Sequence, residues 1–318
     1  MGYFCTVLIV KNTEHFRIEK PTILTIGTFD GVHEGHQKLL TRLKDLKSKF
    51  GLNTVILTFS PHPRKVLFPE QKDLKLLTTT SEKLDLLEKF GVDVAVVYPF
   101  SKEFAQIDAQ FYISEILKKS LKVKHIIIGY DHKFGKNREG DINTLRAFSE
   151  KYDYTVEEIS ALDINSIAVS SSKIRQAIDN GNIKLANTFL GYPYSISGKV
   201  VGGKQLGKTI GFPTANIKVE EEEKLIPKIG VYFVEVDLNG EKYFGMLNIG
   251  KNPTTDADNL VKIEVNIFNF DKAIYDETLN IKFIEYLRDE IKFNSVEELI
   301  EQLKQDKENC LDLIKQLK

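Results

Sequence analysis

The period of the hydrophobic pattern changes near the middle of the chain, and this change limits the possible folds more than any other feature. In the first half, short apolar runs alternate with amphipathic stretches, as strands alternate with helices in α/β proteins. The expected strands are residues 23–28, 54–59, 93–97, 125–129 and 154–159. The pattern predicts a doubly wound parallel sheet, in which ligands bind at the carboxyl ends of the strands.

Three stretches between these strands have apolar residues at helical spacing. The first stripe consists of Leu39, Leu40, Leu43, Leu46 and Phe50. The second consists of Leu84, Leu87 and Phe90, with Gly91 as the expected stop. The third consists of Phe111, Ile113, Ile116 and Leu117.

From residue 194 onward, apolar and polar residues alternate instead, in runs such as GVYFVEVDL (230–238) and VKIEVNIFNF (261–270). Asn239-Gly240 separates two such runs, which is a strong signal for a β-hairpin. We expect a small antiparallel β-barrel. A final helix follows, for which Ser295 and Glu298 form the capping-box pattern.

Length and composition place the chain among ordinary globular proteins. Its 318 residues suggest two domains, at about 150 residues each, and we expect them at 1–187 and 188–318.

The net charge of -1 does not indicate a nucleic-acid partner. Cys5 and Cys310 match no zinc or disulfide pattern. The apolar run 4–10 is too short to span a membrane and is expected to be a strand. We expect a cytoplasmic monomer or weak homo-oligomer that acts on small molecules, without a nucleic-acid or membrane partner.

The run GGKQLGKTIGFPTAN (202–216) contains the P-loop pattern G-x-x-x-x-G-K-[ST], which ends in Gly207, Lys208 and Thr209. A P-loop needs a following helix, because the helix N-terminus holds the phosphates. Gly211 and Pro213 would break that helix in its first turns. The surroundings are also antiparallel, so we do not expect a P-loop fold.

The same run has two other interpretations, one of which is an ordinary glycine-rich hairpin. In the other, Thr214 and Asn216 lie on one face of an extended segment, since they are two residues apart. Hydroxyl and amide oxygens suit Mg²⁺ that carries a nucleotide, and glycine backbone can approach the phosphates closely. The run can therefore bind Mg-nucleotide without a P-loop.

The run GKVVGGKQLGKTIGFPTAN (198–216) resembles the signature loop of riboflavin kinases, whose fold is a small β-barrel. The resemblance continues in GVY (230–232), NIGKNPT (248–254), IEV (263–265) and LRDEIKF (287–293). It implies that Thr214 and Asn216 are Mg-ATP ligands. It also implies that Glu264 is the catalytic base that accepts the proton of the ribityl hydroxyl; without the motif, Glu264 would be interpreted as a surface charge.

The resemblance implies further binding residues in this half. The ATP-binding residues would be Gly203, Lys204, Gly207, Lys208, Thr214 and Asn216. The flavin-binding residues would be Gly211, Phe212 and Arg288. For Arg288, a structural salt bridge is the alternative interpretation.

In the first half, GTFDGVHEGHQ (27–37) follows an expected strand and opens an expected helix. His33 and His36 are three residues apart, which places both imidazoles on one side of the helix start. A helix N-terminus favours an anion, and two imidazoles can donate hydrogen bonds to a triphosphate as charge develops. Zinc is the alternative, but no third ligand lies nearby in the sequence.

H-x-G-H resembles the signature of the nucleotidylyltransferase superfamily, whose members attack the α-phosphate of a nucleotide and release pyrophosphate. VSSSKIRQAI (169–178) resembles its second signature, although serines at a helix start are also ordinary N-caps. GTFDGVHEGH together with FSPHPR (59–64) and GYDHKFG (129–135) resembles the FMN adenylyltransferase domain of bacterial bifunctional FAD synthetases. In those proteins this domain precedes riboflavin kinase, as it does here.

This resemblance also implies site residues. ATP would be bound by Gly27, Thr28, Phe29, Asp30, His33, Gly35, His36, Ser170, Ser171, Ser172 and Arg175. FMN would be bound by Phe59, Pro61, His62, Arg64 and Asp131. His33, His36 and Arg175, with Ser171, would stabilise the adenylyl transition state. The implied enzyme converts riboflavin to FMN and FMN to FAD, with ATP as co-substrate and Mg²⁺ as cofactor in both steps.

The sequence departs from the family pattern at several positions, none of which removes a proposed ligand or base. His132 replaces an aromatic residue, Asn266 a His, Asn269 an Asp, Asp276 a Gly, and Gly202 a His. Two alternatives stay open. The chain could be another transferase on the same scaffold, with a different phosphate acceptor or with CTP, or it could be a flavin-binding module without activity.

Overall fold

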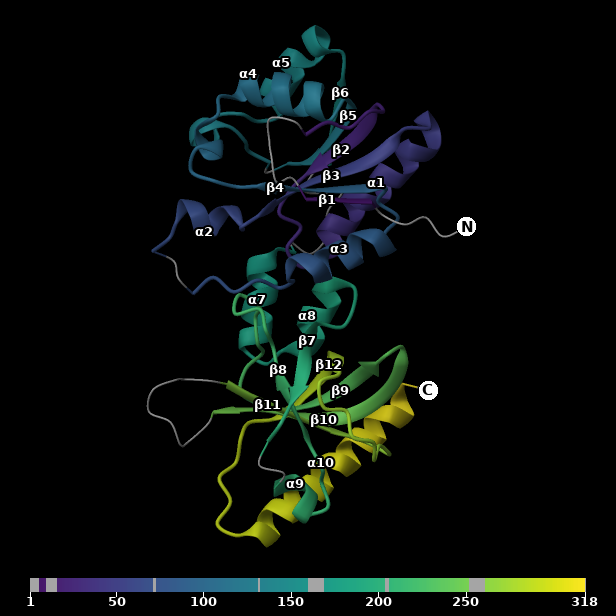
Figure 1. Ribbon diagram of the computed structural model, residues 1–318, viewed down its shortest axis with the longest axis vertical. Helices are drawn as coiled ribbons and strands as arrows, with labels where there is room; N and C mark the ends of the chain where they lie inside the picture. The colour runs from purple at the N-terminus through teal and green to yellow at the C-terminus, as the bar shows by residue number, and fades with distance from the viewer. Residues whose placement is uncertain are drawn as a thin grey trace. The chain divides into compact units, whose positions relative to one another are not determined.

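The computed structural model describes residues 6–9, 16–70, 73–130, 132–159, 169–203, 206–251 and 261–317. Its internal contacts divide the chain into two compact units, of which the first ends at Ser171 and the second begins at Ser172. The elements of each unit are labelled in Figure 1. The expected boundary between residues 187 and 188 lies later in the sequence than this division and stays a prediction.

Within the described residues, the first unit contains a six-stranded sheet in the order β1-β4-β3-β2-β5-β6, with parallel pairings throughout. The strands are β1 (Thr6–Ile9), β2 (Thr22–Ile26), β3 (Asn53–Ser60), β4 (Val94–Pro99), β5 (Val123–Gly129) and β6 (Thr155–Ile159). The five expected strands and the expected parallel sheet are thus confirmed, and the strand expected near the N-terminus is β1. The chain order reverses between β2 and β5, which makes their carboxyl ends the place for a ligand.

Helices lie between these strands. They are α1 (Glu34–Phe50), α2 (Pro63–Leu67), α3 (Thr80–Lys89), α4 (Ala109–Phe111), the π-helical Tyr112–Ser120 and α5 (Ile142–Tyr152), with 3₁₀ turns at Phe104–Gln106 and Lys136–Arg138. The expected stop after α3 is confirmed, since Gly91 has a φ of 79°.

Two expected positions on the helix stripes were wrong. Phe50 is 41% exposed and stacks on the ring of His125. Phe111 is 50% exposed, and Tyr112 occupies the buried stripe in its place. Phe111 lies two residues before Ile113 and therefore on another face of the helix, whereas Tyr112 is four residues before Ile116. The segment is π-helical, and at its end the amide of Leu121 donates to the carbonyl of Ile116, five residues earlier.

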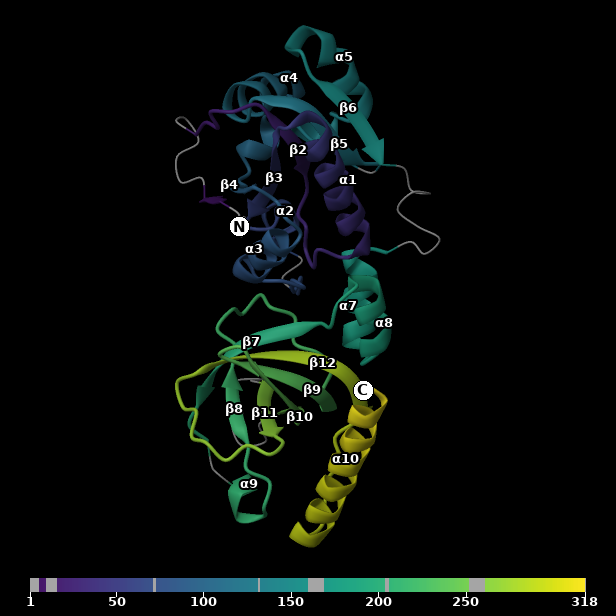
Figure 2. The same ribbon diagram turned by 90° about the vertical axis from the view of Figure 1, so that its right-hand side faces the viewer.

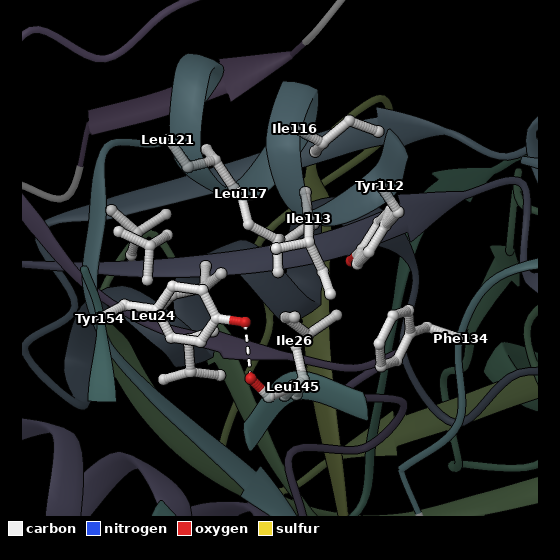
Figure 3. Close-up of a cluster of buried hydrophobic side chains, with 14 of the residues drawn as sticks. Leu24, Ile26, Tyr112, Ile113, Ile116, Leu117, Leu121, Phe134, Leu145 and Tyr154 are labelled. Atoms are coloured by element: carbon white, nitrogen blue, oxygen red, sulfur yellow. Dashed lines mark hydrogen bonds between the residues drawn. The ribbon is translucent and has the colours of Figure 1, made fainter. Parts of the chain in front are cut away.

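Both faces of the sheet are buried, as the doubly wound fold requires. On one face, Leu24 and Ile26 of β2 pack against the π-helical segment and α5 (Figure 3). Tyr154 donates a hydrogen bond of 2.7 Å to the carbonyl of Leu145 in the same cluster. On the other face, Ile23 packs against the apolar stripe of α1.

In the described part of the second unit, six strands close an antiparallel barrel in the order β10-β11-β8-β7-β12-β9, which confirms the expected fold. The strands are β7 (Ser195–Val201), β8 (Ala215–Lys218), β9 (Gly230–Leu238), β10 (Glu241–Lys251), β11 (Val261–Ile267) and β12 (Thr278–Arg288). The expected hairpin between β9 and β10 is confirmed. Its turn residues Asn239 and Gly240 have φ values of 54° and 87°.

The remaining helices are α7 (Ser171–Asp179), α8 (Ile183–Leu190), α9 (Leu206–Thr209) and α10 (Val296–Gln316). α8 is tied to the barrel because Asn187 donates to the carbonyl of Phe283 in β12 and accepts from the amide of Tyr194. α10 lies along the outside of the barrel (Figure 2), where its Cys310 joins a buried apolar cluster with Phe233.

The start of α10 departs from the expected capping box. Ser295 does accept a hydrogen bond from the amide of Glu298, at 3.2 Å. The carboxylate of Glu298, however, accepts from the amide of Asn294 and not from that of the N-cap residue. The N-cap is therefore confirmed, and its reciprocal half is displaced by one residue.

Candidate active sites

The loop between β2 and α1 has an unusual backbone. Phe29, Gly31 and Val32 have φ values of 49°, 82° and 34°, so two non-glycine residues adopt the left-handed region. Such strain persists only where surrounding contacts hold it, and it is concentrated at functional sites. Here Phe29 and Val32 are fully buried. The loop is thus held in a fixed path from the end of the strand to the first turn of α1.

His33 and His36 meet at the start of α1. Their rings stack with 3.7 Å between centroids, and Nδ1 of the N-cap residue His33 accepts a hydrogen bond from the amide of His36 at 3.4 Å. Because Nδ1 accepts, the proton of neutral His33 lies on Nε2. This nitrogen can donate to a ligand at the helix N-terminus.

His36 is half-buried, and its buried Nδ1 has no hydrogen-bond partner among the described residues. Burial, the neighbouring His33 and the Lys83 ammonium together lower the pKa of His36 well below its ordinary value. His36 is therefore neutral near pH 7, with one ring nitrogen as a donor. The two histidines form a donor pair at a helix end that favours anions.

Other expected ATP-binding residues support this loop. Oδ1 of the buried Asp30 accepts from the amides of Leu77 and Thr78, at 2.9 and 3.1 Å. Ser171 donates to the carbonyl of Asp30 at 2.9 Å, so the structure brings this serine of the second signature to the first. Ser172 and Arg175 lie on α7 in the second unit, and their part in the phosphate site stays a prediction.

The residues expected to bind FMN follow β3. Phe59 lies near the end of this strand, 5.5 Å from the ring of Phe100 and 5.8 Å from that of Phe104. His62 is the N-cap of α2, and its Nδ1 accepts from the amide of Arg64 at 3.2 Å. Pro61 follows a cis peptide bond. Asp131 lies outside the described residues.

His132, which departs from the family pattern, lies three residues beyond the end of β5. Its Nε2 is buried and has no hydrogen-bond partner among the described residues. Burial, and then Arg138, lower the pKa of His132 to about 4. The ring packs over Phe134 with 5.9 Å between centroids, so a neutral imidazole occupies a position suited to an aromatic ring.

One residue near the histidine pair was missed by the sequence analysis. Lys83 in α3 is only 7% exposed, and its Nζ donates to the carbonyl of Thr28 and the hydroxyl of Thr58. Its spacing in the sequence could have indicated that it is buried, since Lys83 lies four residues before Leu87 on the apolar stripe of the helix. A lysine in such a stripe is unusual.

The second site is built on three adjacent strands of the barrel. Asn216 of β8 is directly opposite Glu264 of β11, and Glu264 is directly opposite Asn248 of β10. The flanking residues Ile217 and Ile263 are buried, so this polar row faces out of the barrel. Asn248 was not assigned a role from the sequence. It became visible only when the register of β10 and β11 was known.

The glycine-rich run closes over this row. A Cβ placed on Gly203 would lie 2.0 Å from Nδ2 of Asn216. A Cβ placed on Gly207 would lie 3.3 Å from Oγ1 of Thr214 and 2.2 Å from the carbonyl oxygen of Phe212. Only glycine at both positions allows the backbone to come this close to the two expected metal ligands. Lys204 of the same run lies outside the described residues.

The structure also answers the P-loop question. The run contains one helical turn, α9, which we did not expect, but it ends at Thr209 before Gly211 with a φ of 81°. The chain then turns back, since the amide of Phe212 donates to the carbonyl of Gly207 at 2.8 Å. In the described part of this run, α9 ends one residue after Lys208 and no further helix begins, so the run lacks the helix N-terminus of a P-loop. Lys208 itself is exposed.

Mg²⁺ fits the donors of this site. Thr214 and Asn216 offer a hydroxyl and an amide oxygen, and Mg²⁺ is a hard cation that binds oxygen ligands. Among the described residues there is no group of three or more His, Cys, Asp or Glu side chains that could hold a metal by itself. A magnesium ion that arrives with a nucleotide needs only one or two protein ligands. At present the carboxylate of Glu264 pairs with Lys262 at 2.8 Å.

Arg288 is engaged by the protein. Its Nη2 lies 2.6 Å from the carboxylate of Asp306 in α10, Nε donates to the same carboxylate, and Nη1 donates to the carbonyl of Asp289. This is the salt bridge that the sequence left as the alternative. Its role as a flavin ligand stays a prediction.

The other departures have local explanations. Asn266 donates to the carbonyl of Pro213 at 2.7 Å and so supports the residue before Thr214. Asn269 and Asp276 have φ values of 54° and 68°, a region in which Asn and Asp are enriched among non-glycine residues. Gly202 is exposed.

Comparisons with known proteins agree with both halves of the chain. The FAD synthetase family matches residues 15–173, and the riboflavin kinase family matches residues 190–314. The bifunctional riboflavin kinase/FMN adenylyltransferase of Listeria monocytogenes is 40% identical over 90% of both chains. The protein of the same name from Bacillus subtilis is 36% identical over 91% of this chain and 92% of its own.

The chain belongs to the bifunctional riboflavin kinase/FMN adenylyltransferase family. The two families match in the order expected from the motifs. A crystal structure of a protein named macrolide-efflux protein, from Streptococcus pneumoniae, is also similar, with 34% identity and a TM-score of 0.88 over 95% of this chain and 97% of that one. In the part of this chain that the structure describes, no helix has the length and apolar character needed to cross a membrane.

Proposed function

We propose that the barrel unit phosphorylates riboflavin to FMN and that the first unit adenylylates FMN to FAD, each step with Mg-ATP. The observation that carries the proposal is the convergence of Gly203 and Gly207 on Asn216 and Thr214, with Glu264 opposite Asn216. This geometry supports a phosphate-binding loop beside an oxygen-rich metal site and a carboxylate.

In the kinase step, Glu264 accepts the proton of the ribityl 5′-hydroxyl. The hydroxyl oxygen forms a bond to the γ-phosphorus, and the bond from that phosphorus to the β-γ bridging oxygen breaks, which releases ADP. A carboxylate suffices as the base because phosphoryl transfer depends mainly on positioning and charge stabilisation. Thr214 and Asn216 would hold Mg²⁺, which neutralises phosphate charge when it is bound.

In the adenylyl step, a phosphate oxygen of FMN forms a bond to the α-phosphorus of a second ATP, and pyrophosphate leaves. His33 and His36 donate hydrogen bonds to the phosphates as negative charge develops. Ser171 and Arg175 complete the phosphate site, and Gly35, which is buried at the start of α1, leaves room for the nucleotide. Phe59, His62 and Arg64 bind the flavin.

We extend the proposal to the setting of the enzyme. The adenylyltransferase domain spans 1–187 and the kinase domain 188–318. The enzyme acts in the cytoplasm on small molecules, as a monomer or weak homo-oligomer, without a nucleic-acid or membrane partner.

The proposal is tested by incubating the purified protein with riboflavin, ATP and Mg²⁺ and separating the flavins by chromatography. We expect FMN first and FAD afterwards. If FMN accumulates and is never adenylylated, even with CTP in place of ATP, the first unit acts on another phosphate acceptor. If FMN is converted only with CTP, the nucleotide assignment is wrong. If both riboflavin and added FMN stay unchanged, the protein is not this enzyme.

The division of labour is tested with Glu264→Gln, which removes the base and keeps the shape. We expect FMN formation to fall by about 100-fold or more, while FAD formation from added FMN is unchanged. Glu220→Gln is the matched control, because Glu220 is exposed in a loop of the same unit. A folded Glu264→Gln protein that lost both activities, or neither, would contradict the assignment.

A further inference from the structure

Lys83 is a charged residue in an environment that does not suit a charge. It lies in the first turn of α3 and is 7% exposed, packed under the loop that precedes α1. A cation at a helix N-terminus opposes the helix dipole, and an ammonium group loses most of its hydration when it is buried. Burial of this ammonium group therefore costs free energy, which its hydrogen bonds have to offset.

The contacts of Lys83 close a triangle of three hydrogen-bonding groups. Nζ donates to the carbonyl of Thr28 at 3.2 Å and to Oγ1 of Thr58 at 3.0 Å, and Oγ1 of Thr58 donates to the same carbonyl at 3.1 Å. Thr28 immediately precedes Phe29, where the left-handed path of the loop begins. The triangle thus holds the loop at the point from which it directs the two histidines.

The charges around Lys83 do not neutralise it by contact. Among the described residues it forms no ion pair within 4 Å. Asp30 on the loop is the acidic group that acts on it, but Oδ1 of Asp30 accepts hydrogen bonds from residues 77 and 78. On the side of α1, Lys83 faces the neutral His36, which stacks on His33, and on the side of β3 it faces the hydroxyl of Thr58. Glu82 on α3 caps its own helix at the amide of Thr79.

We propose that Lys83 is a positioning residue for adenylyl transfer, whose ammonium fixes the carbonyl of Thr28 and places unpaired positive charge beneath the site of the nucleotide phosphates. The inference rests on the proposed function of the first unit. Phosphate supplies the opposite charge that the protein does not, and the charge needs no reorganisation when the substrate binds.

The ionisation of Lys83 provides a readout that a purely structural role would not give. Burial lowers the pKa of Lys83 to about 8, although Asp30 opposes the shift. The group is therefore charged at pH 7 and loses its charge as the pH rises through this value. Adenylyl transfer by the unmodified protein is expected to weaken over this range because KM for ATP rises.

The test compares Lys83→Met with the unmodified protein and with the control Lys89→Met, which changes an exposed lysine at the other end of α3. FAD formation from FMN and Mg-ATP is measured from pH 6.5 to 9, and thermal unfolding is recorded for each protein. We expect Lys83→Met to lower kcat/KM for ATP by at least tenfold at pH 7 and to abolish the decline above pH 8. Lys89→Met should retain both the rate and the decline.

Thr58→Val is the second variant, in case Lys83→Met does not fold. It removes one corner of the triangle and keeps the size of the side chain, and we expect a smaller loss of kcat/KM in a protein that folds with a moderately lower transition temperature. The inference is overturned if the folded Lys83→Met protein matches Lys89→Met in rate and pH profile, or if Thr58→Val has no effect and the unmodified protein shows no decline above pH 8. If the unmodified protein itself makes no FAD from FMN, the proposed function fails instead.

Discussion

The ion pair between Arg288 and Asp306 provides the sharpest test of the energetics of the second unit. Asp306 is 1% exposed and accepts hydrogen bonds from Nε and Nη2 of Arg288 and from Nε2 of Gln302. Replacing Asp306 with Ala removes the opposite charge while the guanidinium, whose side chain is 18% exposed, stays against the barrel.

Breaking a buried pair by removing one partner costs about 3–5 kcal/mol, because it leaves an uncompensated charge. We expect a value near the lower limit, about 3 kcal/mol, since Arg288 keeps its bond to the carbonyl of Asp289 and can regain some water. The control is Asp312→Ala, which breaks an exposed pair with Lys315 on the same helix. Such surface pairs contribute about 0–1 kcal/mol.

The assay is urea unfolding of the full chain, followed by circular dichroism and by the loss of riboflavin kinase activity, because the chain contains no tryptophan. Two compact units need not unfold together, so the kinase signal reports on the barrel. A shift of less than about 1 kcal/mol for Asp306→Ala, equal to that of the control, would refute the reasoning. In the double variant Arg288→Met/Asp306→Leu most of the stability should return, since apolar replacement of a buried pair is often neutral. If KM for riboflavin still rises in this stable variant, Arg288 also binds the flavin.

Two further predictions concern the kinase loop and acid stability. Gly203→Ala should displace Asn216, whose Nδ2 would lie 2.0 Å from the new methyl group, and should lower kinase activity by about 100-fold. The control is the neighbouring Gly202→Ala, which has nothing within 4 Å of its Cβ and should retain the activity. Equal rates of the two variants in a flavin assay would contradict the metal-ligand assignment. Burial raises the pKa of Asp93, but hydrogen bonds from Lys47 and Thr54 outweigh this effect, so that the pKa lies below its ordinary value. The ionised Asp93 therefore stabilises the fold above about pH 4, and this stabilisation is lost as the pH falls. In acid unfolding followed by circular dichroism, Asp93→Asn should depend less on pH below 4 than the unmodified protein does. Identical unfolding curves would contradict this prediction.

Local signals predicted the elements reliably, because hydrophobic periodicity and turn chemistry act over a few residues. The strands of the parallel sheet, the Asn239-Gly240 hairpin and the N-cap Ser295 were all found in this way. The errors also had local causes. Phe111 lies two residues before Ile113 and so on another face of the helix, and Glu298 accepts from the amide of Asn294, one residue before the N-cap.

The sequence by itself determined the two kinds of fold, their order and the motifs that carry the chemistry. It placed His33 and His36 at a helix start, and Thr214 and Asn216 beside flexible glycines, since these relations depend on spacing along the chain. It could not show that Glu264 lies between Asn216 and Asn248, because strand register joins residues that are far apart in sequence. Nor could it show that Arg288 is bound by Asp306, or that Lys83 is buried under Thr28. These features arise only when packing removes distant side chains from water, and this tertiary environment decides which charges are paired and which remain for a ligand.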